Sequence, residues 1–270
     1  MPLIFLHVPK AAGTTFRAIL ERQYGRDSML NLPVYGRSLD EHLSDINPAA
    51  RARYRAVVGH APFGIGRHFE GETQYVTILR DPVERTVSRY YHILRRGPRW
   101  PIYTTITEAN MSLLDFALGD PDIQVDNGQT RQLAGLDYRA DNVPPGSLTR
   151  EHLDAALANL DRCTVVGVTT EFDRSLVLMR RKLQWRIPLY VEVNKGSADR
   201  TRARSSLTDA EKDAIRQRNS FDDELYRHAM CRLEADCRAE GRGFELELRA
   251  FRALNTIAGR VHHLVRKPRA

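Results

Sequence analysis

A lysine, a glycine and two threonines stand close together near the start of the chain, directly after a short apolar run. Lys10 follows the run 4–8, and Gly13 comes three residues later, where a helical pattern begins. A helix that starts after a buried strand presents unpaired amides and the positive end of its dipole to an anion. The stretch predicts a cradle for a phosphate or sulfate group, built from Lys10, Ala11, Ala12, Gly13, Thr14 and Thr15.

This cradle is not a Walker A loop. That motif is G-x-x-x-x-G-K-[ST], in which the lysine directly follows the second glycine. Here Lys10 precedes Gly13 by three residues, and no glycine stands before the lysine. Taken alone, the stretch fits an ordinary strand–turn–helix with a solvated lysine equally well.

A second candidate anion site follows a later apolar run, 75–79. Arg80 ends this run, Asp81 is a suitable helix N-cap, and Ser88 lies seven residues further along the predicted helix. An arginine fork and a hydroxyl can converge on one phosphate. The alternative is a structural ion pair of Arg80 with Asp81 or Glu84, which would leave Ser88 solvated.

A histidine ends a third apolar run. His60 follows the strand-like segment 55–59, while His7 lies near the end of the first strand and is expected to be structural. Because parallel strands end at one edge of a sheet, Lys10, His60 and Arg80 are expected to lie along that edge. An imidazole with an ordinary pKa of about 6.5 can accept a proton near neutral pH. The alternative is that His60 only caps the strand by bonding a carbonyl.

Strand-like and helix-like segments alternate along the chain, which is typical of a parallel sheet covered by helices. Strands are predicted at 4–8, 55–60, 75–79 and 163–168. The expected fold class is α/β, with three layers: a mostly parallel central sheet flanked by helices, and a ligand at the carboxyl ends of the strands. The stretch 97–107 is expected to be an irregular surface loop able to reach over the site.

Length and composition are those of an ordinary globular protein. The 270 residues, 42% hydrophobic and 28% charged, suit a single domain, 1–270, in which 241–270 forms a C-terminal helical extension. The net charge of +7 suits an anionic ligand but is spread along the chain, so we expect no nucleic acid partner. No apolar run reaches the length of a membrane span, although the basic segment 260–269 permits peripheral contact with a membrane.

The three cysteines indicate a reducing compartment. Cys163 lies in a strand-like run, whereas Cys231 and Cys237 lie on different faces of one predicted helix. No disulfide pairing or metal-ligand spacing emerges, and no secretory signal is visible. We therefore expect a cytoplasmic protein without a metal site, whose oligomeric state cannot be deduced from the sequence.

Together, the two anion motifs resemble those of sulfotransferases. The first, Pro-Lys-x-x-Gly-Thr-Thr, is similar to their 5′-phosphosulfate loop, and Leu-Arg-Asp-Pro-x-x-Arg-x-x-Ser-x-Tyr-Tyr is similar to their 3′-phosphate motif. The resemblance is greatest to the branch that contains heparan sulfate and uronyl 2-O-sulfotransferases, within the P-loop-like sulfotransferase superfamily. It is strong over 3–25 and 55–95 and extends more weakly through 127–133, 165–178 and 194–216.

The resemblance implies a donor, a base and an acceptor. The donor would be 3′-phosphoadenosine 5′-phosphosulfate, with Arg80 and Ser88 at the 3′-phosphate and Lys10 at the leaving group. His60 matches the family's catalytic base, but the second histidine of those relatives is replaced here by Val58. The acceptor would be a hydroxyl group of a glycan or a glycosylated small molecule. The loop that closes over the nucleotide would contribute Ser197 and Arg200.

Two other functions remain open from the residues alone. A nucleotide-dependent kinase of the P-loop class would require ATP and magnesium, but its Walker A lysine is missing. A non-catalytic module could bind acidic polysaccharide or nucleic acid through a basic surface. Sulfuryl transfer is an in-line displacement analogous to phosphoryl transfer, so charge stabilisation dominates. Because a transferring sulfuryl group carries less negative charge than a phosphoryl group, Lys10 and the loop amides can suffice without magnesium.

Overall fold

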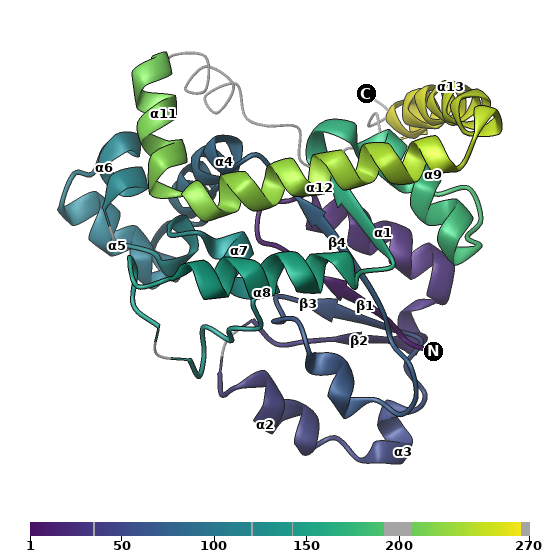
Figure 1. Cartoon of the computed structure of the whole chain (residues 1–270), viewed down its shortest axis with the longest axis horizontal. Coiled ribbons are helices and arrows are strands. Elements are labelled where there is room, and N and C mark those ends of the chain that lie inside the picture. Colours follow the sequence, from purple (N-terminus) through teal and green to yellow (C-terminus); the bar gives the residue numbers. More distant parts are fainter. Residues whose placement is uncertain (35, 120, 142, 192–206, 266–270) are drawn as a thin grey trace.

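A five-stranded parallel sheet forms the centre of the protein (Figure 1). The computed structural model describes residues 1–34, 36–119, 121–141, 143–191 and 207–265, the last five of them as backbone only. The strands are β1 (Leu3–Leu6), β2 (Met29–Asn31), β3 (Ala56–Gly59), β4 (Gln74–Leu79) and β5 (Val165–Val168). Their order in the sheet is β2-β3-β1-β4-β5, so the first strand of the chain is the central one.

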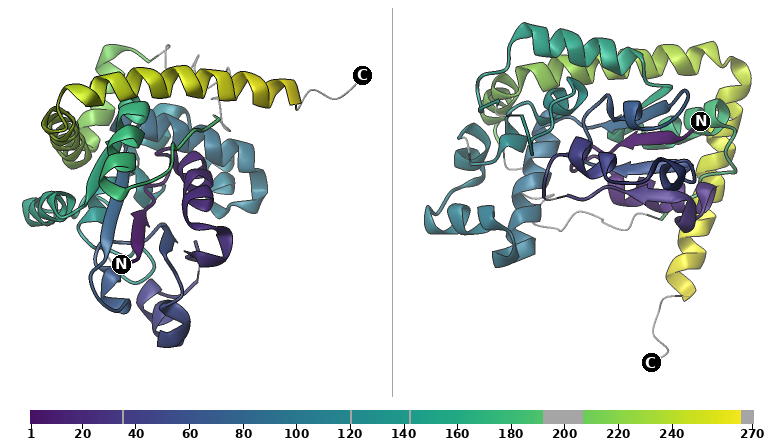
Figure 2. Two further views of the ribbon diagram at one scale, coloured as in Figure 1. Left: turned by 90° about the vertical axis from the view of Figure 1, so that its right-hand side faces the viewer. Right: turned by 90° about the horizontal axis from the view of Figure 1, so that it is seen from below.

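Helices cover both faces of this sheet (Figure 2). Those described are α1 (Gly13–Tyr24), α2 (Leu39–Ser44), α3 (Pro48–Arg51), α4 (Pro82–Arg96), α5 (Pro101–Glu108), α6 (Leu113–Leu118), α7 (Gly128–Leu133), α8 (Arg150–Asp161), α9 (Phe172–Leu183), α11 (Asp209–Arg218), α12 (Ser220–Ala239) and α13 (Arg242–Val265). Short 3-10 helices lie at Arg26–Ser28, Ile65–His68, Gly97–Arg99, Ile123–Val125 and Thr169–Glu171. Figure 2 shows α1 and α8 on opposite sides of the sheet, which buries both faces of the strands, as parallel sheets require.

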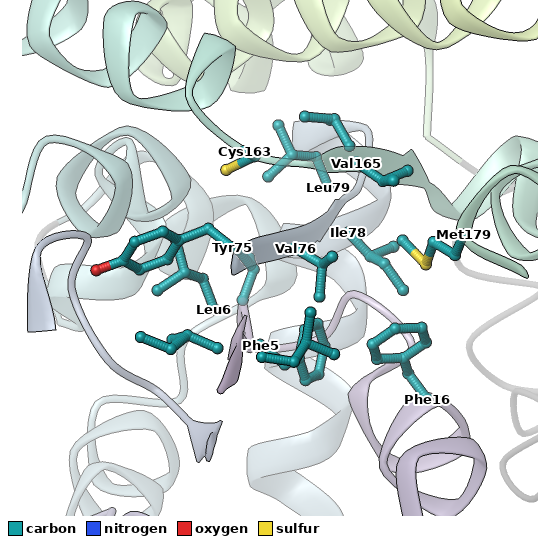
Figure 3. Close-up of a cluster of buried hydrophobic side chains, with 14 of the residues drawn as sticks. Phe5, Leu6, Phe16, Tyr75, Val76, Ile78, Leu79, Cys163, Val165 and Met179 are labelled. Atoms are coloured by element: carbon teal, nitrogen blue, oxygen red, sulfur yellow. The ribbon is translucent and has the colours of Figure 1, made fainter. Parts of the chain in front are cut away.

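The core forms where α1 and α9 pack on one face of the sheet. Phe16 of α1 meets Phe5 of β1 with ring centroids 4.4 Å apart, and Met179 of α9 packs near Ile78 of β4 (Figure 3). These side chains are fully buried. Burying such a side chain contributes about 1.5–3 kcal/mol. The anion cradle is therefore built between a rigid strand and a helix that this core anchors.

The strand register brings two histidines together at the carboxyl edge. Leu6 of β1 pairs with Gly59 of β3, so His7 and His60, the next residues, leave the sheet side by side. Leu6 also pairs with Thr77 of β4, which places Arg80 three residues beyond that level. Strands β2 and β3 lie on one side of β1, and β4 and β5 lie on the other. The carboxyl edge beside β1 is therefore a topological switch point, where ligands bind in open α/β sheets.

The α/β class and its three layers are confirmed, and the predicted helix starts are observed. Asp81, the predicted N-cap, accepts a 2.9 Å hydrogen bond from the backbone N–H of Glu84. Thr208 with Glu211 forms a capping box at the start of α11. Strand β2 was not predicted, because three residues are too few to carry a periodic pattern. The cysteines Cys163, Cys231 and Cys237 are free thiols, and a cytoplasmic location stays a prediction.

The expected loop at 97–107 is wrong. A 3-10 turn covers Gly97–Arg99 and α5 runs over Pro101–Glu108. Pro101 stands at the first position of α5, where its missing N–H costs nothing. Ile106 anchors this helix in a buried cluster, at 1% exposure.

The C-terminal helix α13 packs on α9 through one face. Phe244, Leu248 and Phe251 are buried there, and Glu247 pairs with Arg180 and Arg181 of α9. Over the part of the chain that the structure describes, no helix combines the length and apolar character needed to cross a membrane.

Candidate active site

A cavity of about 1010 Å³ opens at the carboxyl edge of the sheet. Of the predicted site residues that the structure describes, all but one line this cavity: Lys10, Ala12, Gly13, Thr14, Thr15, His60, Arg80 and Ser88. The exception is Ala11, which is fully buried beneath the turn. The other predicted contacts, Ser197 and Arg200, lie outside the described residues.

The turn between β1 and α1 holds two residues in the left-handed conformation. Lys10 has φ 70° and Ala12 has φ 58°, which costs energy for residues with a Cβ. Ala12 occupies the N-cap of α1, and no side chain caps the helix. The first amides of α1 have no carbonyl acceptor within the helix. The turn therefore presents amides and a helix dipole to the cavity, together with the hydroxyls of Thr14 and Thr15.

Gly13 is required by the close approach of His7. A Cβ built on Gly13 would lie 1.6 Å from Nε2 of His7, which is an impossible contact. His7 is held in turn by stacking on Phe5, with ring centroids 5.4 Å apart. His7 is predicted to be structural, and its ring packs directly against Gly13 at the start of α1.

Gly13→Ala is expected to lower the free energy of unfolding by about 1–3 kcal/mol, the usual cost of overpacking. The new methyl group must displace either the His7 ring or the turn. Thermal or denaturant unfolding measures this change. Gly259→Ala is the matched control, because a Cβ at this other helical glycine meets no atom within 4 Å. Equal stability of Gly13→Ala and wild type would contradict the described packing.

The imidazole of His60 is oriented by a backbone carbonyl. Its Nδ1 lies 2.7 Å from the carbonyl oxygen of His7. Since a carbonyl only accepts hydrogen bonds, Nδ1 carries the proton and Nε2 keeps its lone pair in the neutral ring. Burial lowers the pKa of His60 to about 4, with smaller contributions from Arg89, Arg139 and Lys10. The neutral base is thus the stable form at neutral pH.

A second histidine does stand beside His60, although it comes from another strand. The rings of His7 and His60 lie 4.3 Å apart, and burial together with His60 holds the pKa of His7 well below its usual value. The position two residues before His60 is Val58, which lines the cavity as an apolar residue. The sequence pattern could not pair the two histidines, because they are 53 residues apart.

Arg80 joins the end of β4 to the anion cradle. One guanidinium nitrogen donates to the carbonyl of Lys10 at 3.1 Å, and another pairs with Glu84 at 3.2 Å. The ion pair that was the structural alternative is therefore present, but it does not remove Arg80 from the cavity. Nε of Arg80 is buried without a protein hydrogen-bond partner, which suits an anionic ligand.

One face of α4 supplies further lining residues at four-residue intervals. Ser88, His92 and Arg96 all line the cavity, and Ser88 is 1% exposed rather than solvated. Burial lowers the pKa of His92 to about 3, with help from Lys10 and nearby arginines. Helical spacing from Ser88 could have identified both residues. Tyr90 of the same helix does not line the cavity: its hydroxyl donates to the carbonyl of Met111 inside a hydrophobic cluster.

The cavity has a net positive charge. Asp122 pairs with Arg89 at 2.6 Å, and Glu84 pairs with Arg80, so each of these carboxylates is matched by an arginine. Against these two carboxylates, the described residues place five basic side chains along the cavity: Lys10, Arg17, Arg80, Arg89 and Arg96. A cleft lined by one sign of charge attracts a ligand of the opposite sign. Among the described residues, no group of three or more His, Cys, Asp or Glu side chains is placed to hold a metal ion.

Comparison with known proteins identifies a matching family and relatives that are similar over most of this chain. The model of the galactose-3-O-sulfotransferase family matches residues 2–261. The chain is similar to galactose-3-O-sulfotransferase 3 of Mus musculus, with 27% identity over 248 residues, covering 84% of this chain and 55% of that protein. The same enzyme of Homo sapiens shows 27% identity over 84% of this chain and 55% of its own length.

A second type of sulfotransferase is also related. Heparan-sulfate 6-O-sulfotransferase 2 of Gallus gallus is 26% identical over 217 residues, which cover 64% of this chain and 52% of that protein. The chain thus spans little more than half the length of these relatives. The resemblance to sulfotransferases is confirmed, but the matching family differs from the 2-O-sulfotransferase branch that the motifs suggested. The chain belongs to the galactose-3-O-sulfotransferase family.

Proposed function

We propose that this protein transfers a sulfuryl group from 3′-phosphoadenosine 5′-phosphosulfate to a hydroxyl group of a carbohydrate. The observation that carries the proposal is one cavity that three features line together. These are the uncapped N-terminus of α1 with Lys10, Arg80 at the end of the neighbouring strand β4, and the neutral His60. Membership of a sulfotransferase family favours this function over a kinase or a binding module. The whole chain would act as one sulfotransferase domain.

The residues present fit the donor. Its phosphosulfate would contact the amides of α1, Thr14 and Thr15, where no side chain caps the helix. Its 3′-phosphate would contact Arg80, whose Nε is buried without a protein partner, and Ser88, which also lines the cavity. The excess of basic residues along the cavity balances the negative charge of such a nucleotide.

Two side chains would act on the reacting atoms. Nε2 of His60 would take the proton of the acceptor hydroxyl as its oxygen bonds to sulfur. Lys10 would stabilise the phosphate oxygen that keeps the electron pair when the bond between sulfur and that oxygen breaks. The donor supplies an activated sulfuryl group, and 3′,5′-bisphosphoadenosine is the leaving product. Protons and electrons balance without an oxidant or a metal.

The remaining lining residues offer a place for the acceptor. Asn31, Trp100 and Tyr138 line the cavity and present amide, indole and phenol groups. Pockets of this kind combine apolar walls with a few polar groups that fix orientation. A carbohydrate hydroxyl is proposed because the related proteins are named for galactose and heparan sulfate.

A mass-spectrometric transfer assay tests the function directly. The purified chain is incubated with the sulfated nucleotide and a panel of glycans, without magnesium, and products are examined for an added sulfuryl group. Transfer to a galactose-containing or other glycan supports the proposal. ATP-dependent transfer that requires magnesium would indicate the kinase instead. Failure to bind either nucleotide would indicate a binding module.

Arg80→Ala is expected to reduce the preference for a 3′-phosphate roughly tenfold to a hundredfold, the worth of hydrogen bonds to a charged group. Calorimetry compares binding of 3′,5′-bisphosphoadenosine with that of adenosine 5′-phosphate, which lacks the 3′ group. Arg67→Ala is the matched control, since Arg67 pairs with Asp40 on the surface and does not line the cavity. An unchanged preference in Arg80→Ala would leave only structural roles for this arginine, in the ion pair with Glu84 and the hydrogen bond to the Lys10 carbonyl.

A further inference from the structure

The short helix α7 contacts the chain at the ends of two different strands. All six of its residues are buried, including the polar side chains of Gln129, Thr130 and Gln132. Burying so many polar groups is unfavourable unless each makes hydrogen bonds. The bonds that these glutamines make lead to Arg80 and to the residue after His60.

Gln129 holds the backbone of Arg80 through both ends of its amide. The backbone N–H of Arg80 donates to Oε1 of Gln129 at 2.9 Å, and Nε2 of Gln129 donates to the carbonyl of Arg80 at 2.8 Å. Gln129 is 0% exposed, so the pair is shielded from water. Two bonds to one residue restrict both its position and its rotation at the point where the chain leaves β4.

Gln132 makes an equivalent contact at the end of β3. Its Nε2 donates to the carbonyl of Ala61 at 2.8 Å, and its own carbonyl accepts from the N–H of Phe63 at 2.9 Å. Ala61 directly follows His60. These bonds hold the backbone directly after His60, whereas the contact with His7 holds the His60 ring itself.

The N-terminal end of α7 is anchored from α12 by a buried carboxylate. Asp222 accepts from the backbone N–H of Gln129 at 3.2 Å, from that of Thr130 at 2.7 Å and from the hydroxyl of Thr130 at 2.9 Å. Arg85 of α4 pairs with the same carboxylate at 3.2 Å. Asp222 and Arg85 are at most 1% exposed, so this anchor is rigid.

We propose that α7 positions the two halves of the active site separately, with Gln129 setting the 3′-phosphate site through Arg80 and Gln132 setting the base through Ala61. This inference rests on the proposed function. Neither glutamine lines the cavity, so both are positioning residues. Because each glutamine bonds a different strand end, loss of the Gln129 amide should affect the nucleotide preference, and loss of the Gln132 amide should affect turnover.

The test compares Gln129→Leu and Gln132→Leu, which remove one side-chain amide each from the same helix. Gln129→Leu should lower the preference for 3′,5′-bisphosphoadenosine over adenosine 5′-phosphate by about tenfold. Gln132→Leu should lower turnover at saturating donor by about tenfold or more, because small misplacements of a base are costly, and should keep that preference. General destabilisation would instead change both quantities in both variants.

Asn159→Leu is the matched control for loosening of α7. Asn159 of α8 donates to the carbonyl of Leu133 at 2.9 Å, next to Gln132, and this hydrogen bond reaches neither Arg80 nor Ala61. It should keep both the nucleotide preference and the turnover. Should Gln129→Leu fail to fold, Gln129→Glu decides, since it keeps the acceptor for the Arg80 N–H but loses the donor to the Arg80 carbonyl.

The outcomes separate this inference from the proposed function. A wild-type protein that shows no preference for the bisphosphate would contradict the function itself. A wild-type preference that survives in Gln129→Leu, or in Gln129→Glu where it is needed, would overturn only the role of α7. Identical profiles for the Gln129 and Gln132 variants would also overturn it, because they would show a purely structural helix.

Discussion

His60→Ala is expected to lower turnover by about 100- to 10,000-fold, the usual contribution of a general base. The ring is placed for this role because Nδ1 donates to the carbonyl of His7 and leaves the lone pair on Nε2. Donor binding should change little, since the predicted donor contacts lie on α1, β4 and α4. Turnover at saturating donor and donor affinity are measured on the same preparation.

The pH profile gives the same prediction a second measurement. A base acts when neutral, so activity should rise as His60 loses its proton. Because burial lowers the pKa of His60 to about 4, this rise should be centred near pH 4 in kcat/KM of the free enzyme. Between pH 6 and 8 His60 should therefore contribute no slope. An ordinary imidazole would have placed the rise near pH 6.5, as the sequence alone suggested.

His92→Ala is the matched comparison for His60→Ala. Both histidines line the cavity and burial lowers the pKa of both, but only His60 is expected to take the acceptor proton. His92→Ala should therefore lose less turnover than His60→Ala. A larger loss in His92→Ala would move the base to α4. Unfolding or poor donor binding of His60→Ala would instead identify His60 as a structural cap.

Lys10→Ala is expected to lower turnover by about 100- to 1000-fold, because one charge contact to the leaving oxygen is lost. The substitution keeps a residue with a Cβ at φ 70°, so it adds no new backbone strain to the turn. The protein should therefore stay folded. Single-turnover kinetics with saturating donor measure the chemical step apart from donor binding.

Lys212→Ala is the control for loss of a positive charge elsewhere. Lys212 bonds Asp209 at 2.9 Å on α11 and does not line the cavity, so its loss should have little effect. Lys10→Arg keeps a charge but changes its shape and reach, and is expected to recover part of the activity. Near-normal turnover of Lys10→Ala would show that this lysine is not at the leaving group.

Local sequence determined the elements and the residue types at their ends. The apolar run before Lys10 and the cap at Asp81 each act over a few residues, so composition and period suffice to predict them. The rule that parallel strands end at one edge then predicted that Lys10, His60 and Arg80 would lie along that edge, where the cavity is found. Strand β2 escaped prediction because three residues carry no period.

Only the tertiary structure decided how these groups are tuned. The contact of His60 with His7 and the burial that lowers the pKa of His60 depend on residues that the sheet brings together. The same holds for Gln129, which bonds Arg80 across 49 positions of the chain. Desolvation and hydrogen-bond geometry depend on what surrounds a group in space, and a pattern along one chain does not specify those neighbours.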